Sequence, residues 1–250
     1  PRAPWLILLS SRHRAGLRTP SRYDASMETG RVPGLWGAAL ILAVAAGAGH
    51  LLAESAGETF WALVAKPIPV LLLLAGVCVA RSSPLKWPLA LGLALSAVAD
   101  VLIQRPGGFL AGLAVFLLAH LAYTAGFWRA RPALLAARAL PFLLFGSLMG
   151  YWITPGAAGL AVPVAVYILA ISLMMWRAAA LAGAPRLHPL VARLALGGAI
   201  LFAASDSLIA IHRFVAPQVW ANLPIMLLYW LAQAGIAASA LMAGRTEGSG

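Results

Sequence analysis

Two stretches decide the fold: residues 87–104 read WPLALGLALSAVADVLIQ, and residues 190–211 read LVARLALGGAILFAASDSLIAI. Each is long enough to cross a hydrocarbon core of about 30 Å as a helix. Each also carries one aspartate, Asp100 or Asp206, among apolar residues. A carboxylate at the membrane centre costs about 2.5–3.5 kcal/mol on insertion scales, so it needs a protein-lined or wet environment. The two stretches therefore predict a membrane bundle with a polar interior.

Six further apolar runs of about 20 residues each predict more membrane-spanning helices, at 33–52, 60–80, 107–128, 132–151, 159–181 and 219–243. The chain is 62% hydrophobic and only 10% charged, whereas a soluble domain carries about 25% charged residues. We therefore expect an all-α polytopic bundle of about eight transmembrane helices. This divides the chain into an extension (1–31), an eight-helix transmembrane domain (32–243) and a short tail (244–250).

The first 31 residues differ from the rest of the chain. They begin with Pro1 and hold six of the 18 Lys and Arg residues, around a short apolar run from Trp5 to Leu9. A run that short, without a cleavage site, is atypical of a signal peptide. We interpret the segment as a disordered extension or upstream read-through, with Met27 as a candidate natural start.

The formal charge of +11 does not by itself indicate nucleic acid, because arginines in short loops usually set membrane orientation. If the N-terminus is inside, the inner segments hold most of the remaining Lys and Arg, whereas the outer ones hold only Arg105 and Arg213. This asymmetry predicts an even number of helices with both termini in the cytoplasm. The Ala/Arg/Gly-rich composition favours a bacterial inner membrane, with the endoplasmic reticulum membrane as the alternative in a eukaryote.

A faint internal repeat links the two aspartates. Both lie in an Asp-x-Leu-Ile sequence, and Pro69-Val70 and Pro163-Val164 recur at corresponding places in the second and sixth runs. A parallel repeat of four plus four helices would give both halves the same orientation. Chance similarity between Ala- and Leu-rich helices is the alternative. With the repeat, Asp100 and Asp206 are expected at similar depth in the outer half of the membrane.

Other polar residues lie inside the apolar runs. Each alone is more often a packed, hydrogen-bonding residue than a functional one; they are Lys66, Ser96, His120, Tyr123, Tyr167, Ser205, Tyr229 and Gln233. The single Cys78 excludes an internal disulfide, and the sequence contains no His-Glu-x-x-His zinc motif, Gly-x-Ser-x-Gly elbow or phosphate-binding loop. These observations predict no metal site.

The polar residues fall into an ordered set of motifs that resembles the YhhN-like transmembrane family, the lysoplasmalogenases. The resemblance covers roughly residues 33–243. Its motifs are Lys66-Pro-x-Pro-Val, Ser96-x-x-x-Asp100, Phe116-x-x-x-His120-x-x-Tyr123, Pro163-Val-x-x-Tyr167, Gly198-Ala-x-x-Phe-x-x-Ser205-Asp206 and Tyr229-x-x-x-Gln233. Trp230 stands where this family is expected to have a second tyrosine.

The resemblance implies hydrolysis of the vinyl-ether bond of a lysoplasmalogen to a fatty aldehyde and glycerophosphocholine or glycerophosphoethanolamine. Asp100 and Asp206 suit this chemistry as an acid/base pair, and the sequence does not determine which is the acid. Lys66 would hold the phosphate, and the site would be lined by Ser96, His120, Tyr123, Tyr167, Ser205, Tyr229 and Gln233. The implied partners are a lysophospholipid in the bilayer and water, with no cofactor and no nucleic acid.

Two other classes also place acids in membrane helices. A proton-coupled transporter would use them as a relay, and would be indicated by broken helices at both repeat positions. Pro67 and Pro69 predict one such break, and Pro163 lies at the corresponding place. An intramembrane aspartyl protease is disfavoured, because its expected Gly-x-Gly-Asp signature is absent: Asp206 follows Ala-Ala-Ser.

The predicted orientation can be tested by cysteine labelling. A thiol placed at Glu58 should react with an impermeant reagent from outside, and one placed at Arg131 only from inside. Labelling of both positions from one side of the membrane would contradict the orientation.

Overall fold

The computed structural model describes residues 32–185 and 187–246. The chain divides into two compact units, residues 1–41 and 42–250, and the features discussed below belong to the second. The expected extension at 1–31 and the tail beyond Thr246 lie outside the described residues.

Every regular element in the described residues is helical, which confirms the expected all-α class. The elements are α2 (Val32–Ser55), α3 (Thr59–Ala65), α4 (Ile68–Val79), α5 (Lys86–Ile103), α6 (Phe109–Ala130), η1 (Ala136–Ala139), α7 (Leu140–Ile153), η2 (Thr154–Leu160), α8 (Ala161–Ala180), α9 (Pro189–Phe214) and α10 (Asn222–Thr246). Glu54 therefore lies on α2, which continues past the expected end at residue 52. Likewise, α10 continues past the expected end at residue 243.

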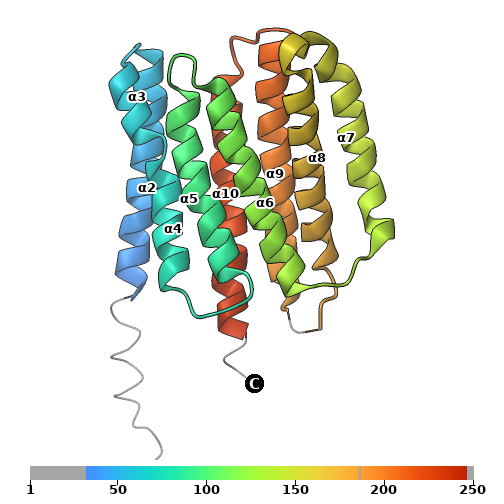
Figure 1. The fold of residues 1–250 in the computed structure, drawn as a ribbon. Coiled ribbons are helices and arrows are strands. Elements are labelled where there is room, and N and C mark those ends of the chain that lie inside the picture. Colours follow the sequence, from blue (N-terminus) through green and yellow to red (C-terminus); the bar gives the residue numbers. More distant parts are fainter. Residues whose placement is uncertain (1–31, 186, 247–250) are drawn as a thin grey trace, which may run out of the picture. The chain divides into compact units, whose positions relative to one another are not determined.

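Seven helical stretches in the described residues are long and apolar enough to cross a membrane, close to the expected eight. The fifth, Ala136–Ala180, has 45 residues, about twice what one crossing requires. A non-helical residue within it, Ala158 at φ 46° and ψ −122°, lies between α7 and α8, which run side by side in Figure 1. The chain is a multi-pass membrane protein.

The helices at the centre of the second unit are α5, α6, α8, α9 and α10. Contacts join α5 to α6, α6 to α8, α8 to α9, and α9 to α10, whereas α7 packs mainly against α8. In Figure 1, α5 and α9 run in the same direction. We call the end of the bundle at which these two helices finish the outer end, following the orientation predicted above. Asp100 and Asp206 both lie in the second half of their helices, and the four-plus-four repeat remains a prediction.

Glycines let α9 and α10 approach at their backbones. A Cβ atom added to Gly198 would lie 2.8 Å from the Ala232 carbonyl oxygen, and one on Gly235 would lie 3.2 Å from the Gly198 Cα. Because lipid supplies no hydrophobic force between helices, such close contact between small residues is a main source of helix association in membranes. This packing holds Asp206 on α9 at a fixed position relative to Tyr229 on α10.

The predicted helix at 60–80 is broken into α3 and α4 around Lys66 and Pro67. Pro67 and Pro69 have no N–H to donate to the preceding turn, so a continuous helix cannot pass through them without losing hydrogen bonds. The predicted helix at 132–151 also begins later, at Leu140, because Leu135 adopts the left-handed conformation at φ 45°. Pro163 has no comparable effect, since it lies in the first turn of α8, where proline is tolerated.

At the inner end of the bundle, Arg177 of α8 binds the connection between α6 and η1. Its side chain is fully buried and packs over the Trp128 ring at 4.2 Å. The guanidinium donates to the carbonyls of Ala133 at 3.0 Å and Leu134 at 3.2 Å, and also to that of Arg131. These carbonyls belong to the irregular connection between α6 and η1 and have no helical donor. Arg177 therefore holds this connection against the end of α8.

We expect Arg177→Ala to lower the free energy of unfolding by about 2–3 kcal/mol, because several charge-assisted hydrogen bonds are lost at a buried position. The control is Arg129→Ala, which removes an exposed arginine from the same region. Thermal unfolding of detergent-solubilised protein measures both variants. Equal melting temperatures for Arg177→Ala and the wild type would show that the Arg177 hydrogen bonds do not stabilise the fold.

Candidate active site

Asp100 lies on α5 with only 1% of its side chain exposed. Its Oδ2 accepts a 2.7 Å hydrogen bond from the Tyr229 hydroxyl of α10. The Lys66 ammonium lies 3.9 Å from Oδ1. A buried carboxylate needs a nearby cation or hydrogen-bond donors to offset its lost hydration, and here α10 and the α3–α4 break supply them.

Lys66 reaches Asp100 because of the break in the second predicted helix. It directly follows the last residue of α3, and its side chain is 13% exposed. On the same turn, the Ala62 carbonyl accepts a 2.9 Å hydrogen bond from Nδ1 of His50 on α2. The break thus leaves Lys66 as a cation that contacts a buried acid and still reaches the surface of a cavity.

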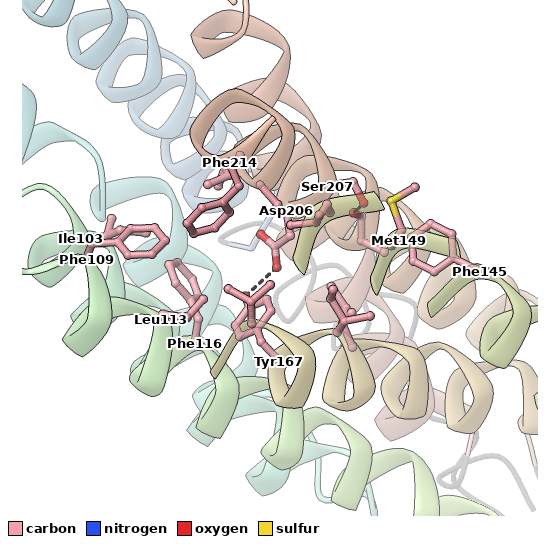
Figure 2. Close-up of a pocket in the computed structure, with 17 residues that line it drawn as sticks. Ile103, Phe109, Leu113, Phe116, Phe145, Met149, Tyr167, Asp206, Ser207 and Phe214 are labelled. Carbon is pink, nitrogen blue, oxygen red and sulfur yellow. Dashed lines mark hydrogen bonds between the residues drawn. The ribbon is translucent and has the colours of Figure 1, made fainter. Parts of the chain in front are cut away.

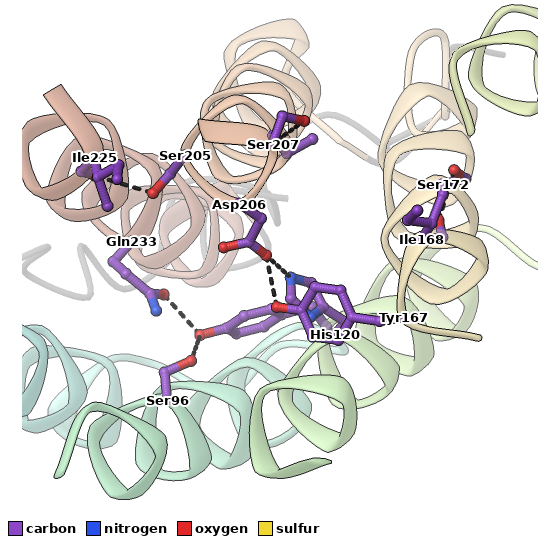
Figure 3. Close-up of polar contacts among 12 residues, drawn as sticks. Ser96, His120, Tyr167, Ile168, Ser172, Ser205, Asp206, Ser207, Ile225 and Gln233 are labelled. Atoms are coloured by element: carbon purple, nitrogen blue, oxygen red, sulfur yellow. Dashed lines mark hydrogen bonds and ion pairs between the residues drawn. The ribbon is translucent and has the colours of Figure 1, made fainter. Parts of the chain in front are cut away.

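Asp206 lies on α9 and is slightly more accessible, at 14%. Its Oδ2 accepts a 2.6 Å hydrogen bond from the Tyr167 hydroxyl of α8 and lies 3.7 Å from His120 Nε2 of α6 (Figure 3). The His120 ring packs edge-on against the Tyr167 ring, with centroids 5.1 Å apart. Residues from three helices, α6, α8 and α9, therefore form this second carboxylate site.

A third polar group joins α5, α6 and α10. The Tyr123 hydroxyl donates to Gln233 Oε1 at 2.7 Å and lies 3.2 Å from Ser96 Oγ; Figure 3 shows Gln233 and Ser96 facing this hydroxyl. The Tyr123 ring occupies the space that a side chain on Gly92 would fill. Glycine at position 92 therefore allows the tyrosine to lie flat against α5.

Ser205 is the predicted site residue whose hydroxyl points elsewhere. It donates a 2.9 Å hydrogen bond to the Ile225 carbonyl of α10, whereas its neighbour Asp206 points towards α8 (Figure 3). Successive residues on a helix face different directions. Ser205 therefore forms a hydrogen bond between α9 and α10 and does not face Asp206's partners.

Two phenylalanines lie between these polar groups. The Phe202 ring contacts the rings of His120, Tyr123 and Tyr229, with centroids 4.6, 6.5 and 5.4 Å apart, and Phe116 contacts both Phe202 and Tyr229. Both positions fall in the sequence motifs, but we did not predict them as site residues. Their rings pack against the aromatic side chains that hold the two aspartates.

An apolar pocket with a volume of about 60 Å³ opens beside Asp206. Helices α6, α7, α8 and α9 line it with large apolar side chains, and Asp206, Tyr167 and Ser207 are its polar members. Figure 2 shows the Asp206 carboxylate and the Tyr167 hydroxyl meeting among these side chains. We did not predict the α7 contribution, Phe145 and Met149, because apolar residues carry no distinguishing signal in an apolar helix.

Several buried polar atoms of the site have no hydrogen-bond partner among the described residues. They include Asp100 Oδ1, both ring nitrogens of His120, and Gln233 Nε2. An unsatisfied buried polar group costs about 1–3 kcal/mol, so such atoms are well placed to bind a reacting group. The described residues contain no group of three or more His, Cys, Asp or Glu side chains arranged to hold a metal ion.

These observations define a polytopic helical membrane protein with two buried, tyrosine-bonded carboxylates, one of which faces an apolar pocket. The sequence model of the YhhN family matches residues 61–240, and the chain belongs to this family. That match confirms the resemblance drawn from the sequence motifs.

Three relatives carry the name lysoplasmalogenase. TMEM86B of Rattus norvegicus is 34% identical over 165 residues, covering 65% of this chain and 65% of the rat protein. TMEM86B of Homo sapiens is 34% identical over 186 residues, covering 73% and 76%. A protein of Mycobacterium tuberculosis is 35% identical over 158 residues, covering 59% and 58%. The matched region thus spans less than two thirds of the rat and mycobacterial proteins. No solved structure matches this chain.

Proposed function

We propose that this protein is a lysoplasmalogenase, which hydrolyses the vinyl-ether bond of a lysoplasmalogen to a fatty aldehyde and a glycerophospho-base. The observation that carries the proposal is a pair of buried carboxylates, one of them facing an apolar pocket between membrane helices. Such a pocket suits the hydrocarbon chain of a lipid, and acids beside it suit a bond that is cleaved by protonation. The names of the relatives support the same activity.

The chemistry needs one acid and one base. Protonation of the vinyl-ether β-carbon gives an oxocarbenium ion, and water then adds to the α-carbon. The resulting hemiacetal collapses to the aldehyde and the glycerol hydroxyl. A positioned acid accelerates such a proton transfer by about 10²–10⁴-fold, and negative charge beside the cation stabilises the transition state. Proton transfer alone suffices for these steps, so we propose that no cofactor takes part.

We assign the acid role to Asp206, because it lines the apolar pocket in which the chain and its vinyl carbon would lie. Asp100, whose negative charge Lys66 balances, would take a proton from the attacking water. In the collapse, the hemiacetal hydroxyl returns a proton to Asp206, and Asp100 gives its proton to the departing glycerol oxygen. Both carboxyl groups then regain their starting states, and one water is consumed for each aldehyde released.

The remaining predicted residues would bind substrate or hold the acids in place. Tyr167 and Tyr229 each donate to one aspartate, and His120 Nε2 lies 3.7 Å from Asp206 Oδ2. We propose that the site is lined by Lys66, Ser96, His120, Tyr123, Tyr167, Tyr229 and Gln233, and that Ser205 instead holds α9 against α10 through its hydrogen bond to Ile225. Aromatic rings could also contact a choline ammonium.

The geometry favours this reading over a proton-coupled transporter. A transporter of the repeat type would break the helices at both corresponding positions. Here the α3–α4 break occurs in the first half, but α8 is continuous through Tyr167 and Pro163 lies in its first turn. The single break places Lys66 against Asp100. A catalytic site that does not move also needs this contact, so the break does not by itself indicate a transporter.

We expect Asp100→Asn and Asp206→Asn each to abolish most aldehyde release, because asparagine keeps the size of the side chain and removes its ionisable group. The double variant should lose little more, since members of one catalytic unit are strongly non-additive. The wild type should show a bell-shaped dependence of rate on pH, as one group must be protonated and the other charged. Aldehyde release from purified protein measures all three effects.

Glu58→Gln is the matched control, because it removes an exposed carboxylate and should leave turnover unchanged. Normal folding and membrane insertion of each variant are checked by its melting temperature. Near-wild-type turnover in either folded single Asn variant would rule out the paired-aspartate mechanism.

A further inference from the structure

A second, polar cavity lies at the outer end of the bundle. It has a volume of about 400 Å³, and its charged and polar lining residues are His50, Glu54, Lys66, Gln104, His212, Arg213 and Asn222. We infer that this cavity binds the zwitterionic head group of the substrate, with Arg213, His212 and Lys66 at the phosphate and Glu54 at the ammonium. The inference rests on the proposed function and assigns to the head group three residues outside the sequence motifs, Glu54, His212 and Arg213.

The two cations in the lining supply the phosphate site. Arg213 has its guanidinium carbon 3.7 Å from the centroid of the Phe109 ring, and stacking of this kind leaves the in-plane N–H groups free to bind oxygens. Lys66 lines the same cavity and adds a compact ammonium. A planar guanidinium and an ammonium together are a common way to bind a phosphate group.

His212 can add a neutral donor. Its Nδ1 accepts a 2.9 Å hydrogen bond from the backbone N–H of Gln218. An imidazole whose Nδ1 is an acceptor carries its proton on Nε2. The neutral ring of His212 therefore offers an N–H to an anionic oxygen in the cavity.

Glu54 is the only acidic residue among those that line the cavity. Its Oε2 lies 3.8 Å from His50 Nε2, and its side chain is 39% exposed. The His50 ring is held by its Nδ1–H bond to the Ala62 carbonyl. A cavity lined by one carboxylate and two cations carries charges complementary to those of a phosphate joined to an ammonium group.

The cavity adjoins the apolar pocket. Both are lined by Ile103, Phe109 and Ile209. Asp206 lines the apolar pocket, and Lys66 in the polar cavity reaches towards Asp100. A lysolipid with its chain in the apolar pocket and its head group in the polar cavity would therefore place its ether linkage beside the two acids.

Three substrates distinguish binding of the phosphate from binding of the ammonium group. They are 1-alkenyl-glycerophosphocholine, 1-alkenyl-glycerol-3-phosphate, which lacks the ammonium, and 1-alkenyl-glycerol, which lacks both groups. Arg213→Gln should raise KM about tenfold for the two phosphate-bearing substrates and leave the third unchanged. Glu54→Gln should raise KM only for the choline substrate. In each case kcat should stay within about twofold, because binding lost equally from ground and transition states changes KM alone.

The controls are Arg105→Gln and Glu58→Gln, which remove outer-end charges that do not line this cavity. If Arg213→Gln or Glu54→Gln changed KM equally for all three substrates, or changed it for none of them, the assignment of that residue would be overturned.

A binding measurement separates this inference from the proposed function. Glycerophosphocholine, the bare head-group fragment, should raise the melting temperature of the Asp206→Asn protein, and Arg213→Gln in that background should remove the shift. If the wild type releases no aldehyde, the proposed function fails, and this measurement still decides whether the cavity binds the head group. No shift, or a shift that Arg213→Gln leaves intact, would overturn the inference.

Discussion

The rest of the structure depends on the cost of placing two carboxylates inside a membrane. A lone charge at that depth is unfavourable by several kcal/mol, and each aspartate is therefore held by groups from other helices. Asp100 receives a hydroxyl from α10 and a cation from the α3–α4 break, whereas Asp206 receives a hydroxyl from α8 and lies beside an imidazole from α6. Because these partners come from three other helices and from the α3–α4 break, the two acids constrain how the bundle assembles.

Asp100 and Asp206 lie in different electrostatic environments, and this difference separates their roles in the proposed mechanism. Asp100 has a lysine at 3.9 Å, so its negative charge is balanced on the side that leads to the polar cavity. Asp206 faces apolar side chains of the neighbouring pocket, where a neutral acid is less costly than a charged one. The α3–α4 break produces this difference, because the Lys66 side chain of a continuous helix would point in another direction and would not reach Asp100. Close packing of Gly198 and Gly235 then keeps α9 and α10 in fixed register.

Much of this arrangement could be predicted from the sequence, because polar residues are rare in apolar helices and each one stands out. Asp100, Asp206 and Lys66 were recognisable for that reason. Phe116, Phe202 and the α7 residues of the pocket were not, since an aromatic residue in an apolar run has no distinguishing pattern. The direction of the Ser205 hydroxyl depends on the rotation of α9, which sequence spacing does not determine. Glu54, His212 and Arg213 lie near helix ends, where charged residues are also expected simply to set orientation.

The central claim is that an acid of the protein protonates a vinyl carbon within the membrane. Hydrolysis of a lysoplasmalogen by the purified protein in D₂O, followed by immediate reduction of the aldehyde and mass spectrometry, tests it most directly. We expect one deuterium on the carbon next to the former aldehyde carbon, because the acid has exchanged its proton with solvent before delivering it. Aldehyde released without deuterium at that carbon, when the protein's acids have equilibrated with D₂O, would contradict protonation at carbon as the mechanism.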